Sequence, residues 1–281
     1  MTLIPQDDSD ARAAYSAQRR LLRRISDHIH QAHLAQGAQE TIQGLAMVVT
    51  TEASVDERLN YVMPRRGTAW LPENHLIDAI AQLRQQQRTP VVWYADGLFP
   101  PSFGQTMLRQ GLQSQQEWPL MIYQGPPVLP AVLDVEQMRP LPAEQAERAW
   151  QEAQQNATLW QVWHNPLQPL GLNASFSVWD VAAWRGERMV MLMRASCHER
   201  SLHLMARAIH VSAQDQHDAL LSACAQSLLS ALYDPAQTSA ADLAFVIAPS
   251  AAERKLWREL GFIDGGSLIR FRSAASTPKT A

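Results

Sequence analysis

One stretch near the C-terminal end, residues 248–262, constrains the fold of this chain most, because it encodes a complete helix between two strands. Ser250 is placed to cap the start of the helix, and Glu253 three residues later completes a capping box. Gly261 supplies the left-handed residue that commonly ends a helix. Short apolar runs at residues 242–248 and 267–271 predict a buried strand on each side. The stretch therefore predicts an α/β protein.

Upstream, the chain predicts a strand, a helix, a three-strand meander and a second helix before this unit. Arg-Gly-Glu and His-Glu-Arg sequences mark the two turns of the meander. The expected elements are a strand at about residues 132–138, a helix at 142–157, strands at 176–184, 188–197 and 201–211, and a helix at 220–232.

This order of elements, together with the Leu-Gly-Phe at residues 260–262 after a helix, resembles the GNAT (Gcn5-related N-acetyltransferase) fold. The resemblance covers about residues 131–273 and rests more on the order of elements than on motifs. It implies a transferase that moves an acyl group from acyl-CoA to an amine.

The family motif Q/R-x-x-G-x-G/A, which opens the helix that holds acetyl-CoA, corresponds here to residues 214–219. Gln214 and Ala219 match the motif, whereas His217 stands in place of its first glycine, beside Asp215 and Asp218. A side chain at that position and two carboxylates both oppose a bound pyrophosphate, so CoA binding stays open. The cofactor residues that the resemblance implies are Ile209, His210, Val211, Gln214, His217, Asp218 and Ala219.

The catalytic residues of the family are altered as well. By its spacing before Leu-Gly-Phe, Trp257 takes the place of a tyrosine that in many GNAT enzymes protonates the leaving thiolate. An indole N–H does not act as a general acid at neutral pH. Strand alternation places His203 on one face with Met205 and Ile209, and His210 on the other. We assign neither histidine as a general base, so the catalytic residues remain unknown.

The N-terminal half repeats part of this plan. A strand at residues 89–95, a helix at 101–109 and a strand at 119–123 match the C-terminal unit element for element. Before them, residues 44–51 and 59–63 predict a strand pair, and residues 76–87 a helix. This half shows no recognisable Q/R-x-x-G-x-G/A motif, and a generic α/β domain remains an alternative to a true duplication.

We therefore expect an α/β fold of two GNAT-like domains, each a mixed, mainly antiparallel sheet flanked by helices, as in a tandem GNAT-like protein with a degenerate acetyl-CoA motif. Proline clusters at residues 125–130 and 140–142 place the boundary near residue 130. The expected domains are residues 1–130 and 131–273, followed by a small, polar tail at residues 274–281 that we expect to be disordered.

Composition restricts the partners. The formal net charge of -3 over 281 residues argues against a nucleic-acid-binding protein, and no run is apolar and long enough for a membrane span. His28, His30 and His33 lie at steps that spread them around a helix, so we predict no metal site. Two cysteines without an apolar signal segment favour reduced thiols and a cytoplasmic protein.

Two functions remain open from the sequence. One is an N-acyltransferase that acetylates a small-molecule or peptide amine with acetyl-CoA as co-substrate. The other is a non-catalytic GNAT-like module for ligand sensing or protein interaction. The sequence does not indicate the oligomeric state. It does not indicate the acceptor either, because acceptor sites are built from variable loops.

Overall fold

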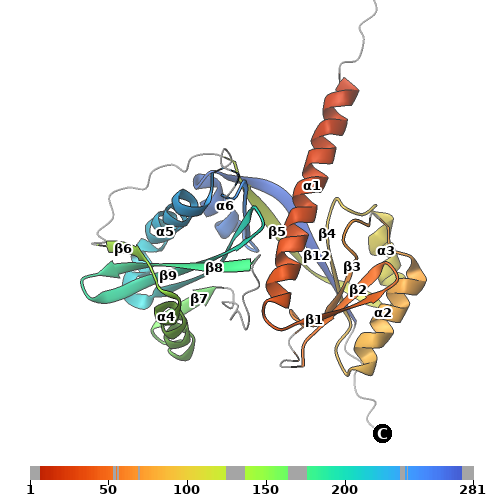
Figure 1. Cartoon of the computed structure of the whole chain (residues 1–281), viewed down its shortest axis with the longest axis horizontal. Helices are drawn as coiled ribbons and strands as arrows, with labels where there is room; N and C mark the ends of the chain where they lie inside the picture. Colours follow the sequence, from red (N-terminus) through yellow and green to blue (C-terminus); the bar gives the residue numbers. More distant parts are fainter. Residues whose placement is uncertain are drawn as a thin grey trace, which may run out of the picture. The chain divides into compact units, whose positions relative to one another are not determined.

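The computed structural model describes residues 7–52, 55, 57–68, 70–124, 137–163, 176–234, 238 and 240–273. Contacts within the chain group it into two compact units (Figure 1). Unit 1 comprises residues 1–119 and 265–281, and unit 2 comprises residues 120–264. The predicted boundary near residue 130 and the predicted tail at residues 274–281 lie outside the described residues.

Unit 1 contains a mixed sheet in the order β1-β2-β3-β4-β12. All neighbouring pairs in it are antiparallel except β3 and β4, which are parallel with Val62 opposite Val92. Helix α2 packs against β1, β2 and β3, and α1 contacts β4. The elements are α1 (Asp7–Leu34), β1 (Gln39–Gln43), β2 (Ala46–Thr50), β3 (Tyr61–Pro64), α2 (Glu73–Gln85), β4 (Val91–Ala95), α3 (Ser102–Arg109) and β12 (Phe262–Ser273).

In unit 2 the strands pair in the order β5-β11-β10-β9-β8-β6, with β7 pairing to β10, and the first part of β5 belongs to unit 1. Only the β10 and β11 pair is parallel among its described strands. The elements are β5 (Leu112–Tyr123), β6 (Gln137–Pro140), α4 (Ala143–Gln155), β7 (Trp160–Trp163), β8 (Phe176–Arg185), β9 (Arg188–His198), β10 (Ser201–His210), the 3-10 helix η1 (Val211–Gln216), α5 (His217–Leu232), β11 (Leu243–Ile247) and α6 (Ala251–Glu259).

The two faces of the unit 2 sheet are covered by different helices, with α5 and α4 on opposite sides (Figure 1). Strand alternation produces this division. Val181 and Ala183 of β8 pack in the core with α5, whereas Ala182 between them packs in the core with Trp150 of α4. The predicted fold class is therefore confirmed: both units are helix-flanked mixed sheets.

A β-bulge in β10 changes which side chains share a face. The register with β9 shifts between Leu204 and Ala206, so Met205 and Ala206 both pack on the α4 side. Ile209 consequently packs on the α5 side, and His203, which stacks on Phe245, does not share its face. The prediction that His203 and Ile209 lie on one face was wrong, because a bulge interrupts strict alternation.

The helix that the sequence marks most clearly forms as predicted. Ser250 accepts a hydrogen bond from the Glu253 backbone N–H, and the Glu253 side chain accepts one from the Ser250 N–H. Gly261 follows the helix with a φ of 86°. Helix α6 therefore begins and ends where its sequence specifies.

None of the described helices combines the length and the apolar character that crossing a bilayer requires.

Candidate functional sites in the two units

The edge of β10 that the resemblance assigns to CoA is paired with another segment of unit 2. Strands β10 and β11 pair only over Ser201–His203, after which the same edge of β10 pairs with β7 over Arg207–His210. Both partners lie on one edge, because β9 pairs with the other edge along both stretches. The sequence did not predict β7. Its pairing uses the backbone groups that an extended ligand would need.

The predicted cofactor residues come together around the end of β10. Ile209 and His210 end the strand, Val211 and Gln214 lie in η1, and His217, Asp218 and Ala219 begin α5. Their polar groups contact neighbouring residues. The contacts are a Val211 N–H to Leu159 O bond at 2.9 Å, a Gln214 side-chain amide to Gln161 Oε1 bond at 3.0 Å, and a His217 Nδ1 to Asp218 Oδ1 contact at 2.7 Å. These contacts occupy the Val211 N–H and the side chains of Gln214 and His217.

A cavity of about 640 Å³ lies beside these residues in unit 2. The buried Arg207 donates to Glu253 of α6 at 2.6 Å, and its guanidinium carbon lies 4.9 Å from the Trp163 ring centroid. Burial lowers the pKa of Arg207 and the Glu253 carboxylate opposes that shift, so the side chain stays charged at neutral pH. Asp218, Glu253 and Glu259 outnumber the two cations Arg207 and Lys255 in the lining. This excess of negative charge disfavours a pyrophosphate.

Trp257, at the position of the family's tyrosine, is a core residue. Its side chain is 1% exposed and meets Phe262 edge-on with 5.1 Å between ring centroids. Its indole nitrogen has no hydrogen-bond partner among the described residues. The side chain therefore contributes to packing and not to proton transfer.

Neither cysteine is a nucleophile at neutral pH. Burial raises the pKa of the Cys197 thiol to about 11 and that of Cys224 to about 12. Because only the thiolate is nucleophilic, both side chains stay unreactive thiols. Cys197 and Cys224 are not joined in a disulfide.

Unit 1 has a corresponding strand-to-helix loop after β3, with a different chemistry. The loop contains Arg65, Arg66, Gly67 and Thr68 and leads toward α2. Gly67 has a φ of 83°, and no atom lies within 4 Å of the position that a Cβ would take. The Thr68 N–H and hydroxyl both donate to the Arg65 carbonyl, at 3.1 and 2.8 Å. The loop is thus an exposed turn built on a glycine, as a phosphate-binding loop requires.

The sequence signal for this loop was present but missed. Residues 64–69 are Pro-Arg-Arg-Gly-Thr-Ala, which places Gly67 and Ala69 at the glycine and the glycine-or-alanine positions of the family motif. Pro64 replaces the first residue of the motif, and that substitution hid the match. The match rests on Gly67 and Ala69 alone, so the motif of this half is degenerate.

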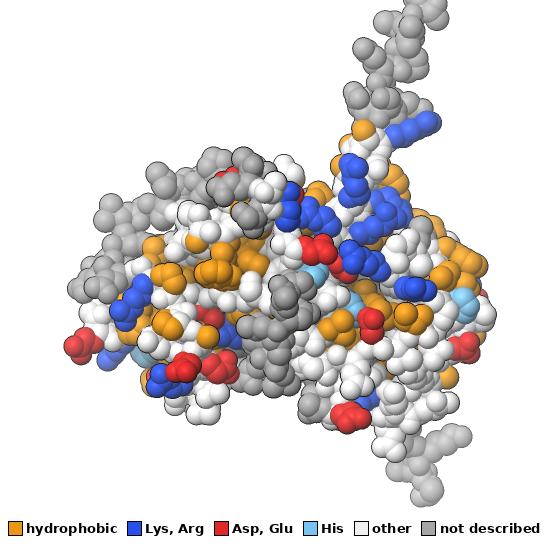
Figure 2. All heavy atoms as spheres, viewed as in Figure 1, with side chains coloured by type: hydrophobic (Ala, Val, Ile, Leu, Met, Phe, Trp, Pro, Cys, Tyr) orange, Lys and Arg blue, Asp and Glu red, His pale blue; other side chains and the backbone are white. Residues whose placement is uncertain are grey.

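A cavity of about 50 Å³ in unit 1 adjoins this loop. Three arginines, Arg23, Arg65 and Arg66, face it against the single carboxylate of Asp27, which pairs with Arg66 at 3.1 Å. Figure 2 shows further Arg side chains gathered along α1. The cavity and its rim are therefore positively charged, the opposite of the unit 2 cavity. Its other lining residues are Ser26, His30, Met47, Met63, Pro64, Gly67, Thr68, Trp93, Tyr94, Ala95, Leu98 and Phe99.

The histidines of α1 have separate partners. His30 Nε2 lies 2.8 Å from a Glu40 carboxylate oxygen on β1, and His33 Nδ1 lies 2.7 Å from the Tyr61 hydroxyl on β3. Only His30 of these two lines the unit 1 cavity. The prediction of their spread around the helix agrees with these separate partners.

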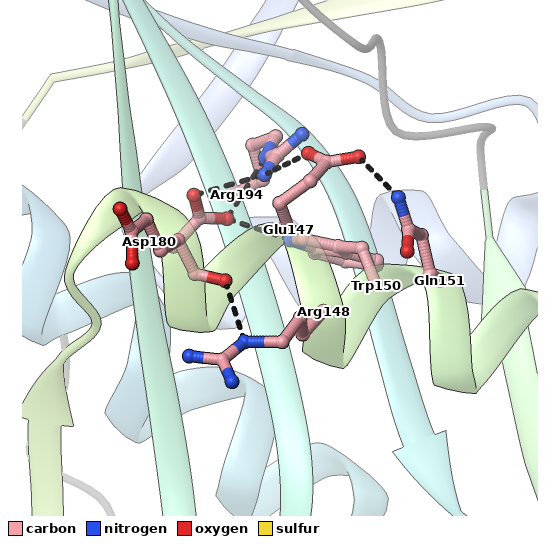
Figure 3. Close-up of polar contacts among 7 residues, drawn as sticks. Glu147, Arg148, Trp150, Gln151, Asp180 and Arg194 are labelled. Atoms are coloured by element: carbon pink, nitrogen blue, oxygen red, sulfur yellow. Dashed lines mark hydrogen bonds and ion pairs between the residues drawn. The ribbon is translucent and has the colours of Figure 1, made fainter.

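A buried polar cluster in unit 2 joins α4 to two strands and is shown in Figure 3. Asp180 accepts hydrogen bonds from the Trp150 indole at 2.7 Å and from Arg194 at 2.8 and 3.1 Å. Glu147 adds a longer ion pair to Arg194 at 3.9 Å. Because Asp180 and Arg194 satisfy each other, this cluster has a structural role.

No family model matches this sequence, and no curated protein matches it. Solved structures do resemble it. A GCN5-related N-acetyltransferase from Kribbella flavida is 11% identical, with a TM-score of 0.70 over 90% of this chain and 95% of that one. A tandem GNAT protein from the clavulanic acid biosynthesis pathway, solved without AcCoA, is 10% identical, with a TM-score of 0.53 over 98% of each chain. A functionally unknown protein from Staphylococcus epidermidis is 9% identical, with a TM-score of 0.56 over 84% of this chain and 94% of that one.

Proposed function

We propose that this chain, which has a tandem GNAT-like fold, is an acyl-CoA-dependent N-acyltransferase whose co-substrate binds to unit 1. The observation that carries the proposal is the exposed loop of Arg65, Arg66, Gly67 and Thr68 beside a positively charged cavity. When bound, the acyl-CoA supplies a thioester carbonyl, acetyl being the expected acyl group. The acceptor is a small-molecule or peptide amine. The protein acts in the cytoplasm, where acyl-CoA is formed and used.

The residues of unit 1 fit a pyrophosphate. Gly67 has the positive φ and the open surroundings that allow a phosphate to approach the backbone. Arg65 and Arg66 offer forked guanidinium groups, which recognise phosphate oxygens through paired hydrogen bonds. These three residues would hold the pyrophosphate, while the adjoining cavity would receive the amine.

Unit 2 favours a second, non-catalytic role for that half of the chain. Strand β7 pairs with the β10 edge, and the Arg207–Glu253 ion pair joins β10 to α6. Both features support a ligand-sensing or interaction module in place of a second transferase site. Of the predicted cofactor residues, His217 and Asp218 would then line a cavity for a ligand other than CoA.

Replacing Arg65 with alanine is expected to weaken acetyl-CoA binding by about tenfold, because a charge-assisted hydrogen bond contributes about 1.5–3 kcal/mol. Calorimetric titration of the full chain with acetyl-CoA measures the change. The matched control is Arg188→Ala, which removes an exposed arginine from β9 of unit 2 and leaves the affinity as it was.

A second variant addresses unit 2 in the same titration. His217→Gly restores the family's glycine, yet we expect no gain in affinity, since β7 and the Arg207–Glu253 ion pair remain in place. The proposal is contradicted if the wild-type chain does not bind acetyl-CoA. It is also contradicted if Arg65→Ala binds normally while His217→Gly binds more tightly.

A further inference from the structure

Ser26 and His30 line the unit 1 cavity. Ser26 Oγ and His30 Nδ1 are buried and have no hydrogen-bond partner among the described residues. The residues are four apart on α1, so they lie on one face of the helix. Ser26 is 9% exposed and His30 is 4% exposed. A buried polar atom without a partner is costly, so this pair indicates a ligand that satisfies both atoms.

Glu40 determines which nitrogen of His30 can act as a proton acceptor. Its carboxylate oxygen lies 2.8 Å from His30 Nε2, and an ionised carboxylate only accepts hydrogen bonds. Nε2 therefore carries the hydrogen and donates it to Glu40. In the neutral imidazole this leaves a lone pair on Nδ1, which is buried. A residue of the cavity lining thus has an oriented proton acceptor.

We propose that His30 is the general base of the acyl transfer and that Glu40 is a positioning residue that fixes its tautomer. The inference rests on the proposed function. The amine nitrogen forms a bond to the thioester carbon, and the carbon–sulfur bond breaks with its electron pair on sulfur. The proton released by the nitrogen passes to His30 Nδ1 and from there to the thiolate or to solvent. Ser26 Oγ accepts the second N–H of the amine and orients it.

The same cavity defines the acceptor class. A volume of about 50 Å³ limits the part of the acceptor that enters the cavity to a small group next to the amine. Trp93 and Phe99 supply aromatic walls, and Ser26 and His30 supply the polar end. The acceptor is therefore a primary amine with a small apolar group next to the nitrogen.

Several charged groups surround His30 and enter any pH dependence. Glu40 approaches from β1, Arg23 and Asp27 from α1 itself, and Arg65 and Arg66 from the loop after β3. Asp27 and Arg66 pair with each other at 3.1 Å. Because the base must be unprotonated, the rate of transfer falls as the pH is lowered.

The test is a pH profile of acetyl transfer by the full chain, with acetyl-CoA and n-butylamine as probes and tert-butylamine as the branched comparison. His30→Gln is expected to lower kcat by about 100-fold or more and to remove the acid limb of the profile. Its affinity for acetyl-CoA stays unchanged. Glu40→Gln keeps His30 but weakens its orientation, so kcat falls less. His33→Gln is the matched control, since His33 lies on the same helix and bonds to Tyr61.

A second measurement does not depend on turnover. The 15N chemical shifts of the His30 ring in the full chain report which nitrogen carries the hydrogen, and we expect an unprotonated Nδ1 that shifts when n-butylamine is added. Protonation at Nδ1 with Nε2 bare overturns the assignment, as does a His30→Gln variant that binds acetyl-CoA and keeps wild-type kcat. Equal rates with the two amines overturn the acceptor class. Failure of the wild-type chain to bind acetyl-CoA overturns the proposed function instead.

Discussion

Replacing Asp180 with alanine is expected to lower the free energy of unfolding by about 3–5 kcal/mol, because it removes the carboxylate that forms two hydrogen bonds with a buried cation. Arg194 is 2% exposed and donates two hydrogen bonds to Asp180. The Trp150 indole N–H loses its acceptor as well. Glu147, at 3.9 Å from Arg194, is too distant to replace the lost hydrogen bonds. Urea denaturation of the full chain measures the loss. The comparison requires that the free energy of unfolding of both proteins depends on urea concentration with the same slope.

Two comparison variants separate the effect of the buried charges on stability from the effect of side-chain packing. Trp150→Phe removes one hydrogen bond and keeps most of the ring volume, so we expect a loss of about 1 kcal/mol. The double variant Asp180→Leu with Arg194→Met removes both charges, and it should cost less than Asp180→Ala alone. A loss below about 1 kcal/mol for Asp180→Ala would show that the cluster does not anchor α4.

Replacing Trp257 with alanine is also expected to cost about 3–5 kcal/mol, through a cavity in the core of unit 2. The side chain is 1% exposed and packs with Leu256, Leu260 and Phe262. Trp257→Phe retains an aromatic ring and should lose less stability. Thermal or chemical unfolding of both variants checks this order.

The same variants test whether Trp257 takes part in proton transfer. We expect Trp257→Phe, assayed well below its unfolding transition, to acetylate n-butylamine at the wild-type kcat. The indole is a buried core group in unit 2, whereas the proposed transfer site is in unit 1. A stable Trp257→Phe protein with no turnover would contradict this separation.

Local signals in the sequence predicted local structure well. Ser250, Glu253 and Gly261 specify α6 because each acts on a backbone group within a few residues of itself. The three-strand meander was equally clear, since its turns mark both ends of β9. For such elements the sequence pattern and the final fold agree.

Pairing between distant segments could not be predicted in this way. Strand β7 is only four residues long and pairs with residues more than forty positions later. The bulge at Met205 depends on register with β9 and has no glycine to mark it. Likewise, β5 and β12 each contribute residues to both units, which proline clusters near residue 130 did not indicate. These features follow from tertiary contacts.

The candidate site in unit 1 contains one feature that local sequence predicts and one that depends on a contact between distant segments. The Arg-Arg-Gly-Thr run was visible in the sequence, and a tolerant comparison with the family motif would have found it. The pairing of His30 with Glu40 was not visible, because it joins a helix to a strand through a side-chain contact at 2.8 Å. A catalytic role can therefore be proposed for a histidine only when its hydrogen-bond partner and the cavity that it lines are known.

Hydrogen–deuterium exchange of the full chain with and without acetyl-CoA tests whether the co-substrate binds to unit 1, because it locates the bound molecule in one measurement. We predict protection over residues 63–76, which include the Arg65–Thr68 loop and the start of α2, and no change over residues 206–221 of unit 2. Protection over residues 206–221, with none over residues 63–76, would contradict it.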